Sequence, residues 1–391
     1  MGDLRNPVAR HVQRGHLAAL FFGPAFPAAI PAAIPVAFPV AFALAFATAL
    51  VGVPTPAVAD DAIGSVTYLE GTVTMTRDGA DVDDVAIGHD VQAFDSVRTG
   101  DDGQAEISID AKQLPQMTIK VSPDTQFTVE VASTASGGTQ STVGILGGQI
   151  ALKVAKLLPS QAVGVKTDYA AMGVRGTDFT VTAPETGDVL VTCDEGEVSV
   201  TDDQGQSLSA VPGTVVEKQA GATYRTLPVA AASLQQFRAQ WRDQRAQFLR
   251  ANALQIIRAN ARLYRELSRQ FNDLHAELNR NQAITRKWAF EDRGRRMGSR
   301  AEVLRERRTI GELLVRMRRV SFRLERVSFR LERLQALHDQ GVGVGSLEDG
   351  TTTAVFFEQV RRERQDMARK LAVTRQLTKQ FVRRNEGRLP E

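Results

Sequence analysis

The pattern of hydrophobic and polar positions changes its period once along the chain, near Pro228. Before this residue the period is two, and in Gly71–Thr76 the apolar Val73 and Met75 alternate with threonines, as in a half-buried strand. After it glycines become sparse and apolar residues recur every three or four positions, which is typical of amphipathic helices. The sequence therefore predicts an all-β region followed by an all-α region.

Short apolar runs separated by turn-forming residues fill the first region. The turns are rich in Gly, Asp, Ser and Pro, as around Gly79, Gly103 and Pro123. Because no helical stretch lies between the runs, we expect a short-stranded sandwich or roll, with solenoid-like stacking of similar strands. The predicted strands include Gly71–Thr76, Ala105–Ile109, Met117–Val121, Gln126–Val131, Gln149–Val154, Phe179–Thr182, Val189–Thr192 and Glu197–Thr201.

Helices are expected throughout the second region. The first extends from about Ala231 to Glu291, with Ser233 as its N-cap. The second extends from about Ser299 to His338, and the glycine-rich segment Gly341–Gly350 connects it to a third helix that Thr351–Thr353 can cap. Connections of this kind favour a long antiparallel helical hairpin or a three-helix bundle.

The second predicted helix contains a perfect tandem heptad repeat, Val320–Arg326 followed by Val327–Arg333. Its apolar residues alternate steps of four and three, which is the a/d pattern of a coiled coil. Phe322 and Phe329 lie off this seam and widen the apolar face. Because the seams are short of apolar residues in places, we expect that the helices can also form a homo-oligomer. The seam consists of Val320, Leu324, Val327, Leu331 and Leu334.

Residues 1–59 have the pattern of an export segment. Three arginines precede the uncharged run Leu17–Val53, and Ala57–Ala59 before Asp60 fits a signal-peptide cleavage site. The alternative is an uncleaved N-terminal anchor, in which residues 17–53 contact the membrane. Both interpretations place the rest of the chain outside the cytoplasm, in the periplasm.

The two regions carry opposite charges. Residues 60–228 hold 25 Asp and Glu against 10 Lys and Arg, a net charge of −15, and residues 229–391 hold 35 Lys and Arg against 19 Asp and Glu, a net charge of +16. Such an asymmetry predicts two physically different domains. The basic helices suit docking on the acidic domain of the same or a neighbouring chain, or an anionic envelope surface of lipid head groups or acidic glycan. Nucleic acid is disfavoured by the export segment and by the lack of a recognised binding motif.

Several motifs of the β region resemble the FecR domain family, over about residues 64–216. The resemblance implies a periplasmic β domain like that of regulators that control sigma factors for iron-uptake genes. Only about 16 residues precede the apolar run, so we do not expect the cytoplasmic domain of such regulators here. One departure is Asp168, where the family usually has Pro. The motifs that carry the resemblance are Gly71–Val73, Ile87–Gly100, Asp102–Ile107, Val121–Phe127, Leu146–Ile150, Thr167–Phe179, Glu195–Val200 and Val211–Gly213.

The most family-specific motif reads G-V-R-G-T-x-F, and we interpret it as structural. Gly176 can supply a positive φ or a close approach between strands. Arg175 is either a fork exposed to a partner's carboxylate or backbone, or a charge paired with Asp178 or Asp168 under the domain, which is the interpretation we favour. The motif consists of Gly173, Val174, Arg175, Gly176, Thr177 and Phe179.

No catalytic, metal or cofactor site is predicted. Cys193 is the only cysteine, its neighbours read as a strand, and we expect it to be buried. The histidines that follow the export segment, His89, His275 and His338, lie in no metalloprotease, nucleophile-elbow or phosphate-loop context. Gly144–Gly148 lacks the lysine of a phosphate-binding loop. We therefore expect a protein that is not an enzyme and uses no cofactor.

Two functions remain open from the sequence. The first is a cell-envelope interaction or signalling scaffold, in which the β domain binds a protein or glycan partner and the helices provide oligomerisation or a contact arm. The second is a structural protein of the cell wall, whose cationic helices hold an anionic surface. Salt-sensitive binding to isolated envelope polymer would favour the second function, and a salt-resistant protein complex would favour the first.

Overall fold

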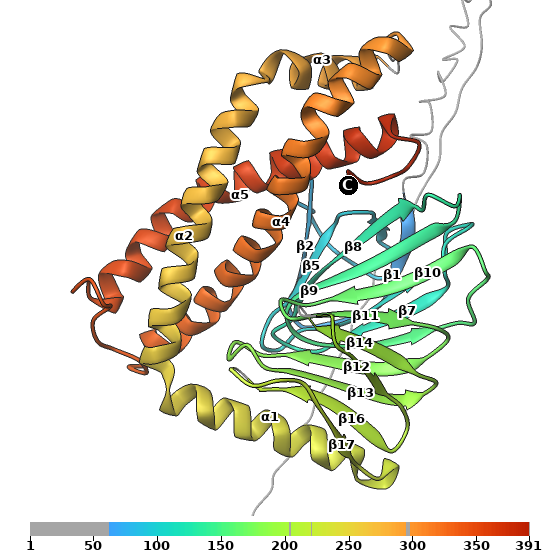
Figure 1. Cartoon of the computed structure of the whole chain (residues 1–391). Coiled ribbons are helices and arrows are strands. Elements are labelled where there is room, and N and C mark those ends of the chain that lie inside the picture. Colours follow the sequence, from blue (N-terminus) through green and yellow to red (C-terminus); the bar gives the residue numbers. More distant parts are fainter. Residues whose placement is uncertain (1–61, 203–204, 220, 295–297, 391) are drawn as a thin grey trace, which may run out of the picture. The chain divides into compact units, whose positions relative to one another are not determined.

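The computed structural model describes residues 62–202, 205–219, 221–294 and 298–390, and the predicted export segment lies outside them. These residues belong to one compact unit, residues 57–391. Strands occupy residues 62–228 and helices follow from residue 231, which confirms the predicted fold class (Figure 1).

The strands pair in two ladders that share one long strand, β9. One ladder has the order β4-β1-β6-β7-β9-β12-β13-β16-β17, and the other has the order β3-β2-β5-β8-β9-β10-β11-β14-β15. Among the described pairs, β9 and β10 run parallel and the others antiparallel. The strands are β1 (Ala62–Glu70), β2 (Val73–Arg77), β3 (Ala80–Asp81), β4 (Asp90–Gln92), β5 (Ser96–Thr99), β6 (Gln104–Ile109), β7 (Met117–Val121), β8 (Gln126–Ser133), β9 (Thr139–Val154), β10 (Gln161–Lys166), β11 (Ala170–Val174), β12 (Asp178–Ala183), β13 (Val189–Glu195), β14 (Val198–Asp202), β15 (Ser207–Ala210), β16 (Thr214–Lys218) and β17 (Arg225–Pro228).

A β-bulge in the middle of β9 changes which residues share a face. Phe127 lies opposite Ile145, but Gln126 lies opposite Gly147, so one extra residue is inserted at Leu146. Side chains alternate along a strand, and the inserted residue resets this alternation. Gly144 and Gly147 therefore lie on the same face of the ladder, opposite to that of Ile145.

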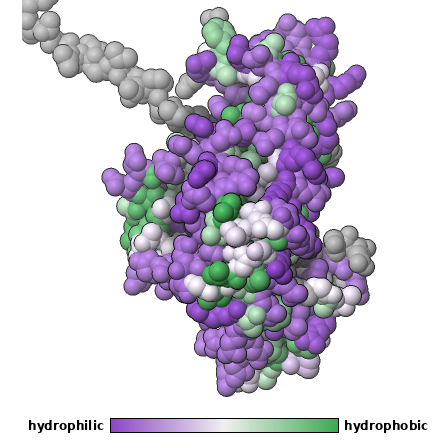
Figure 2. Space-filling view, turned by 90° about the vertical axis from the view of Figure 1, so that its left-hand side faces the viewer, coloured by the Kyte–Doolittle hydropathy of each residue, from purple (hydrophilic) through white to green (hydrophobic). Residues whose placement is uncertain are grey.

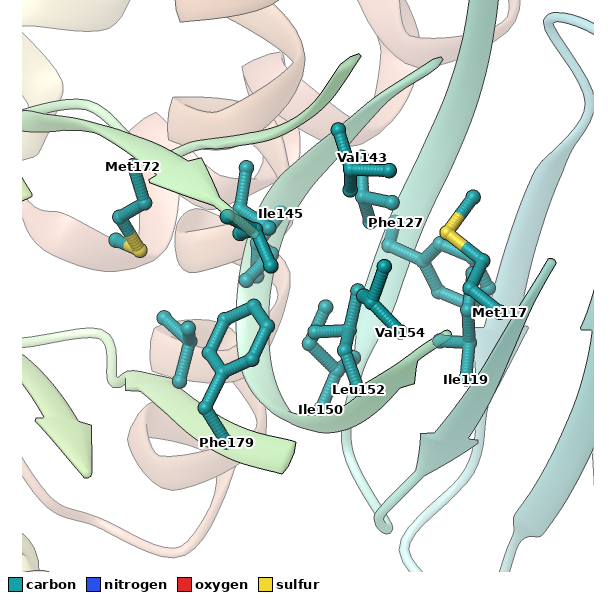
Figure 3. Packing of buried hydrophobic residues seen from close by; sticks show 14 of the residues in the cluster. Met117, Ile119, Phe127, Val143, Ile145, Ile150, Leu152, Val154, Met172 and Phe179 are labelled. Carbon is teal, nitrogen blue, oxygen red and sulfur yellow. The ribbon is translucent and has the colours of Figure 1, made fainter. Parts of the chain in front are cut away.

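The core of the β region lies between the two ladders, as Figure 3 shows for the residues around β9. Phe127, Ile145 and Met172 come from one ladder, and Leu152 and Phe179 from the other. Full burial of a branched or aromatic side chain stabilises a fold by about 1.5–3 kcal/mol, so this cluster dominates the stability of the β region.

Cys193 is buried in β13, as predicted. Burial raises the pKa of its thiol to about 11, so the group stays protonated at neutral pH.

The first predicted helix is wrong, because the structure divides it in three. Asn252 and Asn281 interrupt it, and the Nδ2 of each donates a hydrogen bond to the backbone oxygen four residues earlier, at 2.9 and 3.1 Å. Such a side-chain bond competes with the helical backbone and bends the chain; α1 and α2 accordingly run in different directions in Figure 1. The helical elements are η1 (Ala231–Ser233), α1 (Leu234–Ala251), α2 (Ala253–Arg280), α3 (Gln282–Arg293), α4 (Arg300–Asp339) and α5 (Thr353–Arg384).

Local capping chemistry explains where α4 and α5 begin. Ser299 and Glu302 form a reciprocal capping box at the start of α4, and the Thr352 side chain accepts a hydrogen bond from the backbone N–H of Val355. Ser233 is the N-cap residue of α1 as predicted, but its side chain makes no capping hydrogen bond.

Helices α2, α4 and α5 pack around a second hydrophobic core. The predicted seam of α4 faces this core: Leu324, Val327, Leu331 and Leu334 are buried, and Val320 is half-buried. Within the described residues, no helix combines the length and the apolar composition needed to cross a bilayer.

Candidate functional site: the interface between α4 and the β region

A second face of α4 packs on β9. Phe322 lies against Gly144 and Phe329 against Gly147, so closely that a Cβ added to Gly144 would stand 2.9 Å from the Phe322 ring. Phe322 and Phe329 hold the same position in successive heptads, so they lie on one side of α4. The bulge places Gly144 and Gly147 on one face of β9, and this face receives both rings.

Beside this contact, Asp168 binds two arginines of α4. Asp168 lies in the tight turn between β10 and β11, where the Thr167 side chain accepts a hydrogen bond from the backbone N–H of Ala170. Nη2 of Arg330 lies 2.7 Å from Oδ2 of Asp168. Nη1 of Arg326 lies 2.9 Å from Oδ1, within ion-pair range but without hydrogen-bond geometry. Only 1% of the Arg326 side chain and 6% of the Arg330 side chain are exposed.

Burial of these charges shifts the pKa values of both arginines. Burial lowers the pKa of Arg326 to about 9, although Asp168 acts in the opposite direction, so the guanidinium is still charged at neutral pH. Burial also acts to lower the pKa of Arg330, but Asp168 and Tyr169 outweigh it and leave this pKa raised. One carboxylate thus compensates two buried cations, with help from the aromatic ring of Tyr169, whose centroid lies 6.0 Å from the Arg330 guanidinium.

Further ion pairs join the basic helices to the acidic β region. Arg333 of α4 binds Asp124 through Nη2 at 2.6 Å and Glu185 through Nε at 3.2 Å. The basic helices therefore dock on the acidic region of the same chain, which is one of the two arrangements that the charge asymmetry predicts. The other pairs are Arg98–Glu332, Arg238–Asp194, Arg245–Asp188, Arg318–Glu130 and Lys379–Asp78.

Helix α1 covers the outer face of β13 and β16. Trp241 packs with Leu190 and Val215, and its Nε1 donates a 2.9 Å hydrogen bond to the carboxylate of Glu217. Glu217 is 2% exposed and also pairs with Arg225. The α1 contact therefore anchors the start of the helical region to the end of the β region.

The predicted motif residues form the connection between β11 and β12. Gly176 has φ +63°, in the left-handed region that favours glycine, as expected. The carbonyl oxygen of Thr177 accepts a 2.8 Å hydrogen bond from the N–H of Val154. Gly196 lies against this connection, since a Cβ there would stand 2.8 Å from the Gly176 carbonyl oxygen. Gly173 and Val174 end β11, and Phe179 in β12 is fully buried.

The expected pairing of Arg175 is wrong. Its side chain is exposed, and within the described part of the chain it forms no ion pair. The carboxylate of Asp168 is occupied instead by Arg326 and Arg330, whose guanidiniums approach from α4. The Arg175 side chain is therefore exposed and is not paired under the domain.

The sequence held two signals for this interface. Asp168 replaces the proline that the FecR pattern usually has, and the replacement supplies the acid that binds α4. Gly144 and Gly147 of the segment Gly144–Gly148, which lacks the lysine of a phosphate-binding loop, leave space for the phenylalanines of the heptad repeat. Neither signal indicates which residues it contacts, because those residues lie in a distant part of the sequence.

The fold and this interface define a class of protein, a β-rich region with a helical region docked on it. Residues 95–199 match the family model described as FecR protein, so the resemblance to the FecR domain is confirmed for this segment. No curated protein matches the chain.

Two similar solved structures, at 1.65 and 2.50 Å resolution, are described as a "putative anti-sigma factor from Parabacteroides distasonis". Each is 15% identical, covers 36% of this chain and 62% of that chain, and gives a TM-score of 0.30, which supports no inference about fold or function. The chain thus spans less than two thirds of that protein.

Proposed function

We propose that this chain is a non-enzymatic signalling scaffold of the cell envelope, exported from the cytoplasm, whose β region binds a protein or glycan partner. The match of residues 95–199 to the FecR family supports the signalling class, since the family is regulatory. The helical region, docked on the β region by the ion pairs of α4, would form the rest of the scaffold and provide a contact arm or a homo-oligomeric interface.

The observation that carries this proposal is the exposure of Arg175. This residue lies inside the matched segment, on the tight connection between β11 and β12, and has no ion pair among the described residues. A guanidinium presents a rigid fork of donors that suits a carboxylate or a backbone carbonyl. A connection held by Gly176 and by the Thr177 backbone would present that fork in one orientation to a protein partner.

The test compares two single variants of the exported chain, Arg175→Ala and Lys112→Ala. Lys112 is another exposed cation of the β region without an ion pair among the described residues. Both variants should keep the wild-type melting temperature. Capture of envelope proteins by the wild type and by Lys112→Ala, with loss of one stoichiometric partner only in Arg175→Ala, would support the proposal. A marked drop in the melting temperature of Arg175→Ala, or equal capture by all three proteins, would refute it.

A second candidate function rests on arginines along the outer face of α4. Arg305, Arg308, Arg319 and Arg323 are exposed, share one face, and have no ion pair in the described part of the chain. Figure 2 shows that the side of the molecule it presents is mostly hydrophilic, with hydrophobic residues in small separate patches. The exposed arginines of α4 form a cationic face, which suits an anionic polymer or lipid head groups.

This candidate predicts salt-sensitive pelleting with isolated cell-wall polymer or with anionic vesicles, weakened in the double variant Arg319→Gln/Arg323→Gln. Pelleting with polymer but not with vesicles would assign the glycan. No pelleting at low salt, or no effect of the double variant, would eliminate the second function.

A further inference from the structure

A cleft of about 430 Å³ lies where α1, α4 and the β region meet. Helix α1 forms one wall, with Arg242, Arg245, Leu249 and Arg250, and Arg333 and Leu337 of α4 border the cleft. The two acids of the lining, Asp124 and Glu185, are those that Arg333 binds. The turns that follow β7 and β12, together with Gly148 and Gln149 in the middle of β9, form the opposite wall. Clefts of this size between structural regions, with apolar walls and a few convergent polar groups, are typical of small-ligand sites.

The arginines of this cleft have more hydrogen-bonding capacity than the protein uses. Arg242 and Arg250 are exposed and form no ion pair with any described residue. The Nη1 of Arg245 lies 3.5 Å from Asp188, and its Nε is buried without a hydrogen-bond partner in the described structure. A buried unsatisfied N–H costs roughly 1–3 kcal/mol, so an acceptor at this position would be stabilised.

Another cleft, of about 530 Å³ between α4, α5 and the β region, lacks this excess of free donors. Each arginine of its lining pairs with an acid: Arg98 and Arg364 with Glu332 of α4, Arg375 with Glu325 of α4 at 2.7 Å, and Arg369 with Asp366 of α5. The comparison singles out the cleft beside α1, where the cations outnumber the acids that could satisfy them.

We propose that the cleft beside α1 binds a small organic anion. Its carboxylate or phosphate group would accept hydrogen bonds from Arg242, Arg245 and Arg250, and its apolar part would lie against Leu249 and Leu337. Guanidinium groups bind both kinds of anion with charge-assisted hydrogen bonds. Such a ligand would bridge α1 and α4 and strengthen their docking on the β region. The proposal concerns this cleft alone and does not depend on partner binding by Arg175.

Calorimetric titration of the exported chain with phenyl phosphate tests the site, with phenylacetate as the carboxylate probe and benzyl alcohol as the neutral analogue. The double variant Arg242→Gln/Arg250→Gln removes two exposed cations of the cleft. Arg269→Gln/Arg280→Gln on α2 is the matched control, because these arginines are also exposed and have no ion pair among the described residues. Circular dichroism should show that both variants keep the wild-type fold.

We expect saturable binding of at least one anionic probe at one site, at least tenfold weaker in the cleft variant and unchanged in the control. Stronger binding of phenyl phosphate than of phenylacetate would assign a phosphate ligand, and the reverse order a carboxylate. The proposal is overturned if neither probe binds saturably at millimolar concentration, if benzyl alcohol binds equally well, or if the control variant loses as much affinity as the cleft variant.

Discussion

The two copies of the tandem heptad have the same sequence and different surroundings. Arg326 and Arg330, four residues apart at the junction of the copies, are buried around Asp168. Arg319 and Arg323 hold the equivalent positions seven residues earlier, and both are exposed without an ion pair among the described residues. The spacing on the helix is identical, so only the acid opposite the second pair makes the difference.

The phenylalanines of the two copies differ in the same way. Phe329 is 2% exposed against Gly147, whereas Phe322 against Gly144 is only half-buried. An ideal helix rotates by roughly 20° per heptad relative to a strict seven-residue repeat, so identical side chains do not meet the sheet at the same angle. The comparison shows that a repeated sequence specifies a repeated helix, and that the surface opposite decides how deeply the side chains of each copy are buried.

The largest expected effect comes from removing the shared acid. Asp168→Ala leaves the guanidiniums of Arg326 and Arg330 buried without a counter-charge, which typically costs about 3–5 kcal/mol of unfolding free energy. Urea denaturation measures this loss, and Asp110→Ala, at an exposed acid, is the control. A loss below about 0.5 kcal/mol for Asp168→Ala would mean that the ion pairs of Asp168 with Arg326 and Arg330 do not hold α4 in place.

The second largest expected effect comes from truncating the phenylalanine of each heptad copy. Phe329→Ala should cost about 3 kcal/mol, at the low end for a buried aromatic residue, because glycine lies on one side of the ring. Phe322→Ala should cost about 1 kcal/mol, since its ring is already half in contact with water. The same denaturation experiment compares them, and equal losses would contradict the unequal burial.

Neutralising one arginine in each copy gives a smaller contrast. Arg330→Gln removes the ion pair with Asp168 but leaves Arg326 in place, so we expect a loss of about 1–3 kcal/mol. Arg323→Gln, at the same repeat position, should change the unfolding free energy by less than about 0.5 kcal/mol. Thermal unfolding of the two variants in parallel checks the prediction, which fails if Arg323→Gln is the more destabilising.

The smallest effect concerns the acid opposite Arg333. Burial raises the pKa of Asp124 above 3.8, and Glu185 adds to this rise, while Arg333 opposes it. A raised folded-state pKa means that the acid stabilises the fold below pH 3.8 and that this contribution is lost as pH rises through the folded value. Asp124→Asn should therefore gain stability relative to wild type between acidic and neutral pH, by at most about 1 kcal/mol at this partly exposed site. Denaturation at several pH values measures the difference, and the opposite trend would show that the ion pair with Arg333 dominates.

Local interactions explain what could be predicted from the sequence. The strands with period two, the a/d seam, the capping box of Ser299 and the positive φ of Gly176 all depend on residues a few positions apart. The undivided first helix was wrong because Asn252 and Asn281 have no strong breaking signal in sequence. Their effect appears only when each side chain bonds the preceding turn.

The sequence by itself determined the elements, their faces and the opposite charges of the two regions. Only the tertiary structure decided that Asp168 binds Arg326 and Arg330 rather than Arg175, and that Phe329 and Arg330 are buried while Phe322 and Arg323, at the same repeat positions, are not. The physical reason is that propensity, capping and periodicity act within a few residues, whereas the partner of a buried charge depends on which distant surface the fold brings against it.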